Sequence, residues 1–255
     1  MFQAPHLIIG LGELGSIFAT GLLKLGKTVI PVLRNQNLTE VAETIATPES
    51  VWVCVAEKDI HQLLAEIPTP WRDKLILIQN ELLPHDWQQH GINAPTVISV
   101  WFEKKAGKAP QVVLPSVTYG KLADLVIAVY NKLNLPARIL NDETSLLFEL
   151  VLKNLYIQTS NIAGLAVGGT TSELVEQHAH LLQAVANDVI YLQETLTNQH
   201  FDHSQLMNAL KNAFYGDPNH SCMGRSAPAR LQRALDLANQ HGIALPSIAA
   251  IAASH

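Results

Sequence analysis

A glycine-rich turn near the amino end constrains this chain more than any other feature. Gly10, Gly12 and Gly15 have the spacing G-x-G-x-x-G. They belong to a six-residue run: Gly10, Leu11, Gly12, Glu13, Leu14 and Gly15. The run follows a short apolar segment and opens an amphipathic stretch, which is the context that a dinucleotide-binding fingerprint requires. The spacing therefore predicts that residues 10–15 bind the pyrophosphate of a dinucleotide at the start of a helix. The alternative is a plain strand–turn–helix that uses glycine for geometry alone.

Short, uncharged segments rich in branched residues recur through the first 140 residues. They occupy residues 6–10, 28–33, 51–56, 75–78 and 96–100. Strands that are buried on both faces of a parallel sheet have this composition. Helical stretches lie between them, for example at residues 59–67 and 83–90. The pattern predicts an α/β fold with a Rossmann-type doubly wound parallel sheet over residues 1–140.

The chain changes character after residue 140. Asn141, Asp142 and Glu143 form a typical helix start, and no proline interrupts residues 144–167. Further helical patterns cover residues 172–197, 205–214 and 229–241, and no segment indicates a strand. We therefore expect an all-α substrate and catalytic domain over residues 141–255.

Composition excludes several classes of protein. The chain is 48% apolar and 15% charged, against about 25% charged in an average globular protein, so it is not disordered. Two cysteines allow neither a disulfide framework nor a multi-cysteine zinc module. A net charge of -5 argues against a nucleic-acid partner, and no apolar run is long enough to span a membrane. No basic leader precedes the first apolar segment, so we expect a cytoplasmic protein. His178 and His180 would lie on different sides of a helix and cannot share an ion, and the pair at 200/203 has no evident third ligand, so we expect no metal.

Arg34 ends the second predicted strand, where an NAD site normally has an acidic residue. A guanidinium followed by three amide side chains suits a 2′-phosphate better than a bare hydroxyl. The sequence thus favours NADP(H) as cofactor. Alternatively, Arg34 is a solvated loop charge.

The long predicted helix carries polar residues within an apolar stretch. Lys153, Ile157 and Asn161 are spaced i, i+4, i+8 and share one stripe about 12 Å long. Polar groups among leucines and valines are costly unless they meet partners or a ligand. The stripe is therefore a candidate site, and the alternative is that Lys153 reaches solvent.

Taken together, several segments resemble one known family. They are the glycine turn, Arg34, the Lys153…Asn161 helix, the run Ser221–Cys222–Met223 and residues 241–246. The combination resembles the ketopantoate reductase family, NADPH-dependent enzymes that reduce 2-dehydropantoate to pantoate in pantothenate biosynthesis. The resemblance extends over nearly the whole chain and is faint between residues 101 and 140.

The resemblance implies roles for four residues. Lys153 matches the family's proton donor, and Asn161 matches an asparagine that holds substrate. Ser221 matches a serine that binds the substrate carboxylate. Apart from the resemblance, Arg225 lies four residues beyond Ser221 in a glycine-broken loop, so it either shares that interaction or is a surface charge. Asn80 matches an asparagine that contacts both cofactor and substrate.

Three departures from the family pattern concern the substrate pocket. Ile157 stands where the family has a second asparagine, and Glu81 stands where it has a glycine. No glutamate lies between Ser221 and His241, although the family has a substrate-binding glutamate there. Missing polar partners change which substrate a pocket selects.

The expected function is NADPH-dependent reduction of a 2-oxo acid, either 2-dehydropantoate or a related small molecule, with Lys153 as general acid. One alternative is a non-catalytic NADP(H)-binding redox sensor that lost its substrate chemistry. Another is a sister dehydrogenase that acts on imines or 3-hydroxy acids. The long apolar helix could also bury one face in a homodimer.

Overall fold

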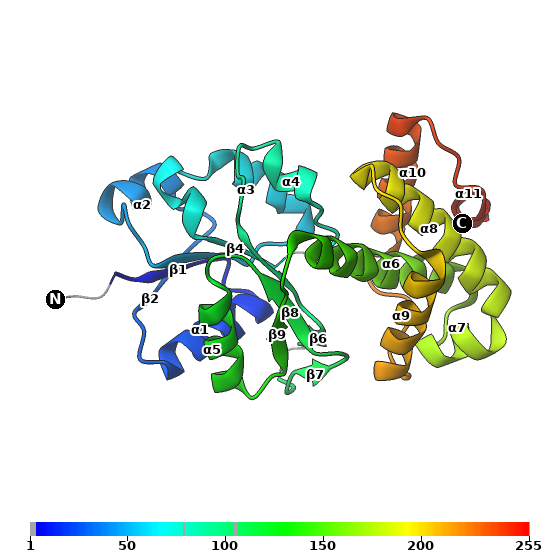
Figure 1. Cartoon of the computed structure of the whole chain (residues 1–255), viewed down its shortest axis with the longest axis horizontal. Coiled ribbons are helices and arrows are strands. Elements are labelled where there is room, and N and C mark those ends of the chain that lie inside the picture. Colours follow the sequence, from blue (N-terminus) through cyan, green and yellow to red (C-terminus); the bar gives the residue numbers. More distant parts are fainter. Residues whose placement is uncertain (1–3, 79, 105–106, 255) are drawn as a thin grey trace. The chain divides into compact units, whose positions relative to one another are not determined.

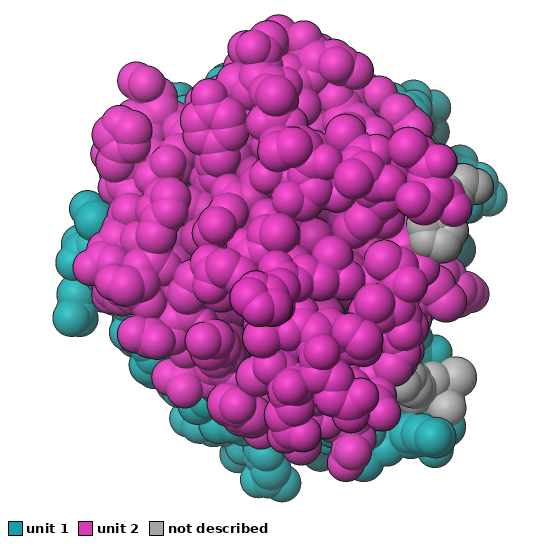
Figure 2. Space-filling model, turned by 90° about the vertical axis from the view of Figure 1, so that its right-hand side faces the viewer, with its two compact units in different colours: residues 1–147 teal, residues 148–255 magenta. Residues whose placement is uncertain are grey.

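The computed structural model describes residues 4–78, 80–104 and 107–254 (Figure 1). The chain divides into two compact units, Met1–Leu147 and Phe148–His255, which Figure 2 shows in different colours. The division falls inside a long helix, whereas the sequence placed the boundary just before that helix, at residue 140.

The first unit is built on a seven-stranded sheet with the order β2-β1-β3-β4-β5-β8-β9. The strands are β1 (His6–Ile9), β2 (Val29–Val32), β3 (Ser50–Val53), β4 (Leu75–Leu77), β5 (Thr96–Ser99), β8 (Ser116–Tyr119) and β9 (Ala137–Ile139). All neighbouring pairs are parallel except β5 and β8. The predicted α/β class and the five predicted strands are confirmed. A separate ribbon pairs β6 (Phe102–Glu103) with β7 (Gln111–Val112).

Helices cover both faces of this sheet. They are α1 (Glu13–Lys24), α2 (Leu38–Thr44), α3 (Ile60–Glu66), α4 (Pro84–Gln88) and α5 (Ala123–Leu133). Figure 1 shows α1 and α5 together on one face and α2, α3 and α4 on the other. The face under α1 holds an aromatic cluster in which the ring of Phe18 lies 5.0 Å from Trp52 and 5.8 Å from Tyr130. Buried aromatic pairs at these separations supply much of the packing energy of a core.

Strand β8 was not predicted from the sequence, because two of its buried side chains are polar. Ser116 and Thr118 are 1% and 0% exposed. The Oγ of Ser116 accepts from the Trp101 N–H at 2.9 Å, and the Thr118 hydroxyl donates to the Val97 carbonyl at 3.0 Å. Since hydrophobic periodicity detects only apolar strands, β8 and its neighbours α5 and β9 gave no clear signal.

The second unit is helical throughout its described part. Its helices are α6 (Glu143–Val167), which begins in the first unit, α7 (Thr171–Gln177), α8 (Ala179–Thr197), α9 (His203–Gly216), α10 (Ala227–His241) and α11 (Pro246–Ala252). The single helix predicted over residues 172–197 is wrong, because the chain leaves helical geometry at His178, with φ -125° and ψ 35°. Thr171 anchors the short α7 by donating its hydroxyl to the Asp217 carbonyl at 2.7 Å. No glycine or proline marks that break, so composition could not reveal it.

Within the described ranges, every helix is too short or too polar to cross a bilayer.

Candidate functional site

The glycine turn between β1 and α1 has a different constraint at each glycine. Gly10 has φ +93°, and a Cβ there would lie 2.8 Å from the Cys54 carbonyl oxygen. A Cβ on Gly15 would lie 2.0 Å from the carbonyl oxygen of Gly10. A Cβ on Gly12, the N-cap of α1, would meet nothing within 4 Å. Two glycines thus allow close packing of protein on protein, while the third faces open space where a helix start attracts an anion.

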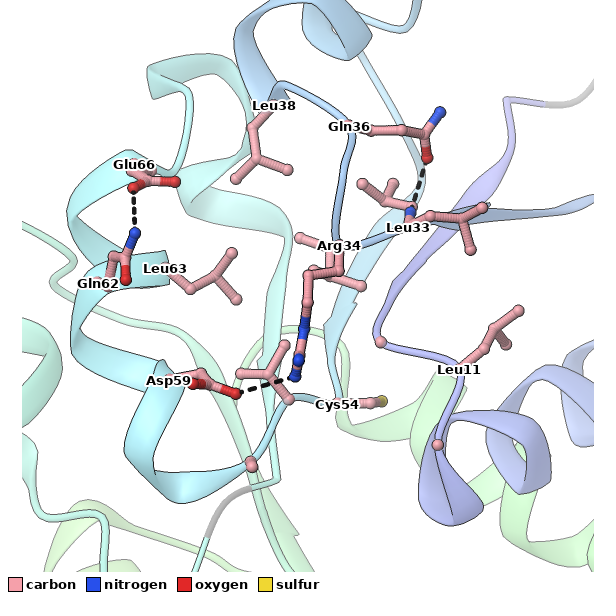
Figure 3. A pocket seen from close by; sticks show the side chains of 16 residues that line it. Leu11, Leu33, Arg34, Gln36, Leu38, Cys54, Asp59, Gln62, Leu63 and Glu66 are labelled. Carbon is pink, nitrogen blue, oxygen red and sulfur yellow. Dashed lines mark hydrogen bonds and ion pairs between the residues drawn. The ribbon is translucent and has the colours of Figure 1, made fainter.

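A cavity of about 600 Å³ opens beside this turn (Figure 3). Its walls come from the carboxyl ends of β1, β2 and β3 and from one side of α3. The chain proceeds from β1 to β2 in one direction and then crosses to β3 on the other side of β1. Doubly wound sheets bind ligands at such a switch point, outside the carboxyl ends of the strands.

Arg34 lines this cavity and points towards Asp59 (Figure 3). Its Nη2 lies 3.3 Å from Oδ2 of Asp59, and the two side chains are 89% and 38% exposed. A pair so exposed to water contributes about 0–1 kcal/mol, so it leaves Arg34 available to a stronger anion. The sequence analysis did not identify Asp59. Asp59 lies at the start of the predicted helix 59–67. That position indicated a helix start, but it did not indicate that Arg34 is the partner of Asp59.

The amide neighbours of Arg34 do not act as a group. The Oε1 of Gln36 accepts from the Leu33 N–H at 2.7 Å and so stabilises the turn after β2. Across the cavity, Gln62 donates to Glu66 at 3.1 Å within α3 (Figure 3). The charged groups that line the cavity are the guanidinium of Arg34 and the carboxylates of Asp59 and Glu66.

Lys104 is a residue to which the sequence analysis assigned no role. Its Nζ lies 3.5 Å from Oε2 of Glu13, and its side chain is 18% exposed. Glu13 is the first residue of α1, where a carboxylate would repel a bound pyrophosphate. Lys104 offsets that charge. The next two residues, 105 and 106, lie outside the described residues.

Asn80 lies in the turn after β4 and is half-buried. It does not line the cavity beside Arg34. Its neighbour Glu81 has φ +63°, a left-handed conformation that glycine adopts most easily. The position at which the resemblance expects glycine therefore has the backbone geometry of a glycine position.

Neither cysteine has the properties of a nucleophile. Burial raises the pKa of the Cys54 thiol far above its usual value. Burial, with a smaller contribution from the Glu173 carboxylate, raises the pKa of Cys222 to about 11. Both thiols stay protonated near neutral pH, and a thiol reacts as its thiolate.

In the second unit, Lys153 is half-buried on α6. Its Nζ lies 5.5 Å from the centre of the Tyr156 ring. That ring lies 6.3 Å from the imidazole of His220, which precedes Ser221 in the chain. The ring face attracts a cation, so this contact holds the ammonium group of Lys153 against the ring.

Asn161 is 7% exposed and is hydrogen-bonded at both ends of its amide. Its Nδ2 donates to the Cys222 carbonyl at 3.3 Å, and its Oδ1 accepts from Nη1 of Arg230 at 2.8 Å. Ile157, one turn earlier on α6, is equally buried. The sequence analysis did not identify Arg230, which lies on α10.

Ser221 is exposed, and its hydroxyl donates to the Met223 carbonyl at 3.2 Å. The segment is fixed to the end of α6 by a bridge between Thr170 and Ser221. Arg225 is exposed beyond it. Contacts within the second unit thus connect Lys153, through the Tyr156 ring, to the segment at 220–223 and to Asn161.

The histidines form no metal site among the described residues, which include no group of three histidine, cysteine or acidic side chains placed to bind an ion. His200 and His203 both approach the carboxylate of Glu194, at 3.6 and 3.2 Å.

This fold, a doubly wound unit followed by a helical unit, is that of NAD(P)-dependent dehydrogenases of the ketopantoate reductase type. The chain is similar over nearly its full length to a PanE/ApbA family ketopantoate reductase from Ralstonia eutropha, with 14% identity, a TM-score of 0.67 and coverage of 97% of this chain and 96% of that one. It is likewise similar to 2-dehydropantoate 2-reductase from Methylococcus capsulatus, with 12% identity, a TM-score of 0.65 and coverage of 98% and 94%.

A D-mandelate dehydrogenase in complex with NADH and anilino(oxo)acetate has a TM-score of 0.64 at 11% identity, with 96% of both chains covered. No family model matches the sequence, and no curated protein is significantly similar to it. The resemblance drawn from the motifs is thus confirmed at the level of the fold.

Proposed function

We propose that this chain is an NADPH-dependent reductase that converts a 2-oxo acid to the 2-hydroxy acid, with 2-dehydropantoate or a related molecule as substrate. One observation carries the proposal: a half-buried lysine, Lys153, lies in the helical unit, and the other unit has a glycine turn at residues 10–15 that is shaped like a dinucleotide cradle. Similar structures are ketopantoate reductases and a D-mandelate dehydrogenase, and both names denote enzymes that interconvert 2-oxo and 2-hydroxy acids.

The cradle fits a dinucleotide because the position beside Gly12 has open space at a helix start. When bound, NADPH supplies the hydride. Residues 10–15 would hold its pyrophosphate, and Lys104 would offset the charge of Glu13 next to it. Arg34 would bind the 2′-phosphate, which as a dianion attracts the guanidinium more strongly than the exposed Asp59 carboxylate does.

Lys153 performs the proton transfer in this proposal. As hydride adds to C2 of the 2-oxo acid, negative charge develops on the carbonyl oxygen, and the ammonium of Lys153 donates its proton there. Ser221 and Asn80 would contact the substrate, as the resemblance implies. The Asn161 amide is already hydrogen-bonded at both ends within the protein, so its contribution is to position neighbouring groups.

The residue at position 157 bears on which 2-oxo acid is the substrate. Ile157 replaces a polar side chain with an apolar one, so the wall beside Lys153 favours a substrate with an apolar substituent on C3. A 2-oxo acid bulkier than 2-dehydropantoate, or one that lacks its terminal hydroxyl, suits such a wall.

The test is NADPH oxidation with a panel of 2-oxo acids that includes 2-dehydropantoate and phenylglyoxylate. Lys153→Ala should lower kcat by about 100-fold or more, the usual contribution of a general acid, and leave the Kd for NADPH within a few-fold. Lys211→Ala, at an exposed lysine on α9, is the matched control. Undiminished turnover in Lys153→Ala would show that another group donates the proton. NADPH binding without turnover of any panel member would favour the redox-sensor alternative.

The proposal includes a homodimer and a cytoplasmic location. One structurally similar ketopantoate reductase, from Staphylococcus aureus, is described as dimeric. Light scattering of the purified protein tests the oligomeric state.

A further inference from the structure

Another cavity, of about 510 Å³, lies in the first unit at the edge of the sheet opposite to the glycine turn. Its lining includes residues 93–95, which precede β5, and residues 119–121, which end β8 and follow it. Strands β1, β3, β4 and β5 are parallel, so the start of β5 lies at the edge opposite to the carboxyl end of β1. Strand β8 is antiparallel to β5, which brings its end to the same edge. The cavity is therefore distinct from the proposed nucleotide site.

The sheet itself fixes the wall of this cavity. Gly120 has φ +126°, and a Cβ there would lie 2.6 Å from the Cα of Thr96, so the turn after β8 packs directly on the start of β5. The Leu122 N–H donates to Oγ1 of Thr96 at 2.9 Å, and the Leu140 N–H donates to the Thr118 carbonyl at 2.8 Å. A ligand would thus enter a site whose backbone is already in place, which lowers the cost of binding.

Apolar side chains make up much of the lining. Among them are Trp87, Pro95, Ile139, Leu140 and Leu146. Ile139 is 42% exposed, so a ligand would cover apolar surface that now faces water. Small-molecule sites typically combine such a lining with a few polar groups, in cavities of about 300–1,000 Å³.

Trp87 adds a polar group to this apolar wall. The residue is 4% exposed, and its indole N–H donates no hydrogen bond to any residue that the structure describes. The N–H of a buried tryptophan usually has an acceptor. An oxygen atom of a ligand in the cavity would supply one.

Charges of both signs also line the cavity. Lys121 and Glu143 are exposed, and within the described ranges neither side chain makes an ion pair or a hydrogen bond. The third charged residue, Asp73, faces Lys74 at 3.8 Å. A simple anion would be attracted by Lys121 and repelled by both carboxylates, and a simple cation would be repelled by Lys121. A molecule that carries an ammonium and a carboxylate can pair with both signs.

We propose that this cavity binds an α-amino acid with a large apolar side chain, in its zwitterionic form. Lys121 would pair with the carboxylate and Glu143 with the ammonium, while the apolar side chain would lie against Trp87 and Ile139. The inference goes beyond the proposed function and does not depend on it, since this cavity and the one beside Arg34 share no lining residue in the described part of the chain.

Calorimetry with the full chain, without nucleotide, tests the proposed ligand class. L-phenylalanine and L-leucine are the probes. The comparison compounds are 3-phenylpropionate, which lacks the ammonium, and 2-phenylethylamine, which lacks the carboxylate. Each should bind at least about 10-fold more weakly than L-phenylalanine, because it loses one charge-assisted contact and keeps the repulsion.

Two variants test the proposed contacts. Lys121→Gln and Glu143→Gln should each raise the Kd for L-phenylalanine about 3- to 10-fold, as expected for a charge-assisted contact at a partly solvated site. The matched controls, Lys132→Gln and Glu40→Gln, remove the same charges from exposed residues of the first unit that do not line the cavity. Glu40, like Glu143, lies in the first turn of a helix. Both controls should leave the Kd unchanged.

A third variant blocks the cavity and keeps its charges. Ala94 is exposed and lines the cavity, so Ala94→Phe should weaken the binding of L-phenylalanine and leave the thermal midpoint close to that of the parent.

The outcomes decide the inference without reference to NADPH turnover. Weaker binding by Lys121→Gln and Glu143→Gln, with both controls unchanged, supports it. Equal binding by the parent and these two variants would place the amino acid elsewhere and overturns it. It is also overturned if the parent binds neither amino acid at millimolar concentration, or if it binds 3-phenylpropionate or 2-phenylethylamine as well as L-phenylalanine.

Discussion

At the residue scale, the contact between Arg34 and Asp59 shows how cofactor choice depends on pairs that lie far apart in the sequence. Arg34 follows β2 and Asp59 precedes α3, yet their side chains meet over the cavity (Figure 3). In the proposed NADPH site, the carboxylate would compete with the 2′-phosphate for the guanidinium and would also repel the phosphate. We therefore expect Asp59 to reduce the affinity for NADPH more than that for NADH.

Asp59→Asn should lower the Kd for NADPH by up to about 5-fold, the equivalent of an exposed ion pair, with less effect on NADH. Fluorescence titration with both nucleotides measures the effect. Glu66→Gln removes the same charge from the same cavity without touching Arg34, and its effect should be smaller. A weaker affinity for NADPH in Asp59→Asn would mean that the carboxylate binds the nucleotide and that Arg34 does not read a phosphate.

Glu81 provides a second prediction at this scale. Its φ of +63° costs a residue with a Cβ about 1 kcal/mol relative to glycine. Glu81→Gly should therefore raise the free energy of unfolding by about 0.5–1 kcal/mol, as measured by urea denaturation. Asn134→Gly is the matched control, since Asn134 has φ +54° and asparagine tolerates that region better. A destabilised Glu81→Gly would show that contacts of the Glu81 side chain outweigh the backbone strain.

At the scale of the element, α1 combines two functions in one turn. Its start packs closely on the turn after β1 and, in the proposed nucleotide site, also leaves room for a ligand. Gly15 serves the first purpose, because its neighbour is the Gly10 carbonyl, and Gly12 serves the second.

The two glycines should therefore respond differently to alanine. Gly15→Ala places a methyl group against backbone and should lower the free energy of unfolding by about 2 kcal/mol or more. Gly12→Ala meets no protein atom, so its stability should change by less than about 0.5 kcal/mol, while its affinity for NADPH falls because the methyl group occupies the space of the pyrophosphate. Urea denaturation and fluorescence titration together check the pair. Unchanged nucleotide affinity in Gly12→Ala would place the phosphates elsewhere.

At the scale of the whole molecule, the distribution of aromatic residues separates the two units. All four tryptophans, at positions 52, 71, 87 and 101, lie in the first unit. Tryptophan fluorescence therefore reports the unfolding of the first unit, which contains the glycine turn at residues 10–15.

Saturating NADP+ should raise the thermal midpoint of the tryptophan signal. At a hundredfold excess over Kd the ligand stabilises the folded state by about 2.7 kcal/mol, which corresponds to about 5–10 °C for a chain of this size. Differential scanning with tryptophan detection measures the shift, and Gly12→Ala should show a smaller one. A midpoint that NADP+ leaves unchanged would contradict a nucleotide site in the first unit.

Local patterns determined much of this molecule. Five strands of the sheet were predictable because each is a continuous apolar run, and the glycine turn was predictable because strand, turn and helix adjoin in sequence. Lys153 and Asn161 were identifiable for the same reason, since helical periodicity places them on one stripe. The sequence by itself thus determined the fold class and indicated one residue of each contact in the candidate site: Arg34, Glu13 and Asn161.

Tertiary structure decided the partners. Asp59 at Arg34, Lys104 at Glu13 and Arg230 at Asn161 come from different elements, and the first and last pairs are 25 and 69 residues apart. Strand β8 and the short helix α7 were hidden for a related reason, because hydrogen bonds to distant residues stabilise them. Periodicity describes only how neighbouring residues share a face, whereas a charge acquires its role from whatever group the folded chain places within a few ångströms of it.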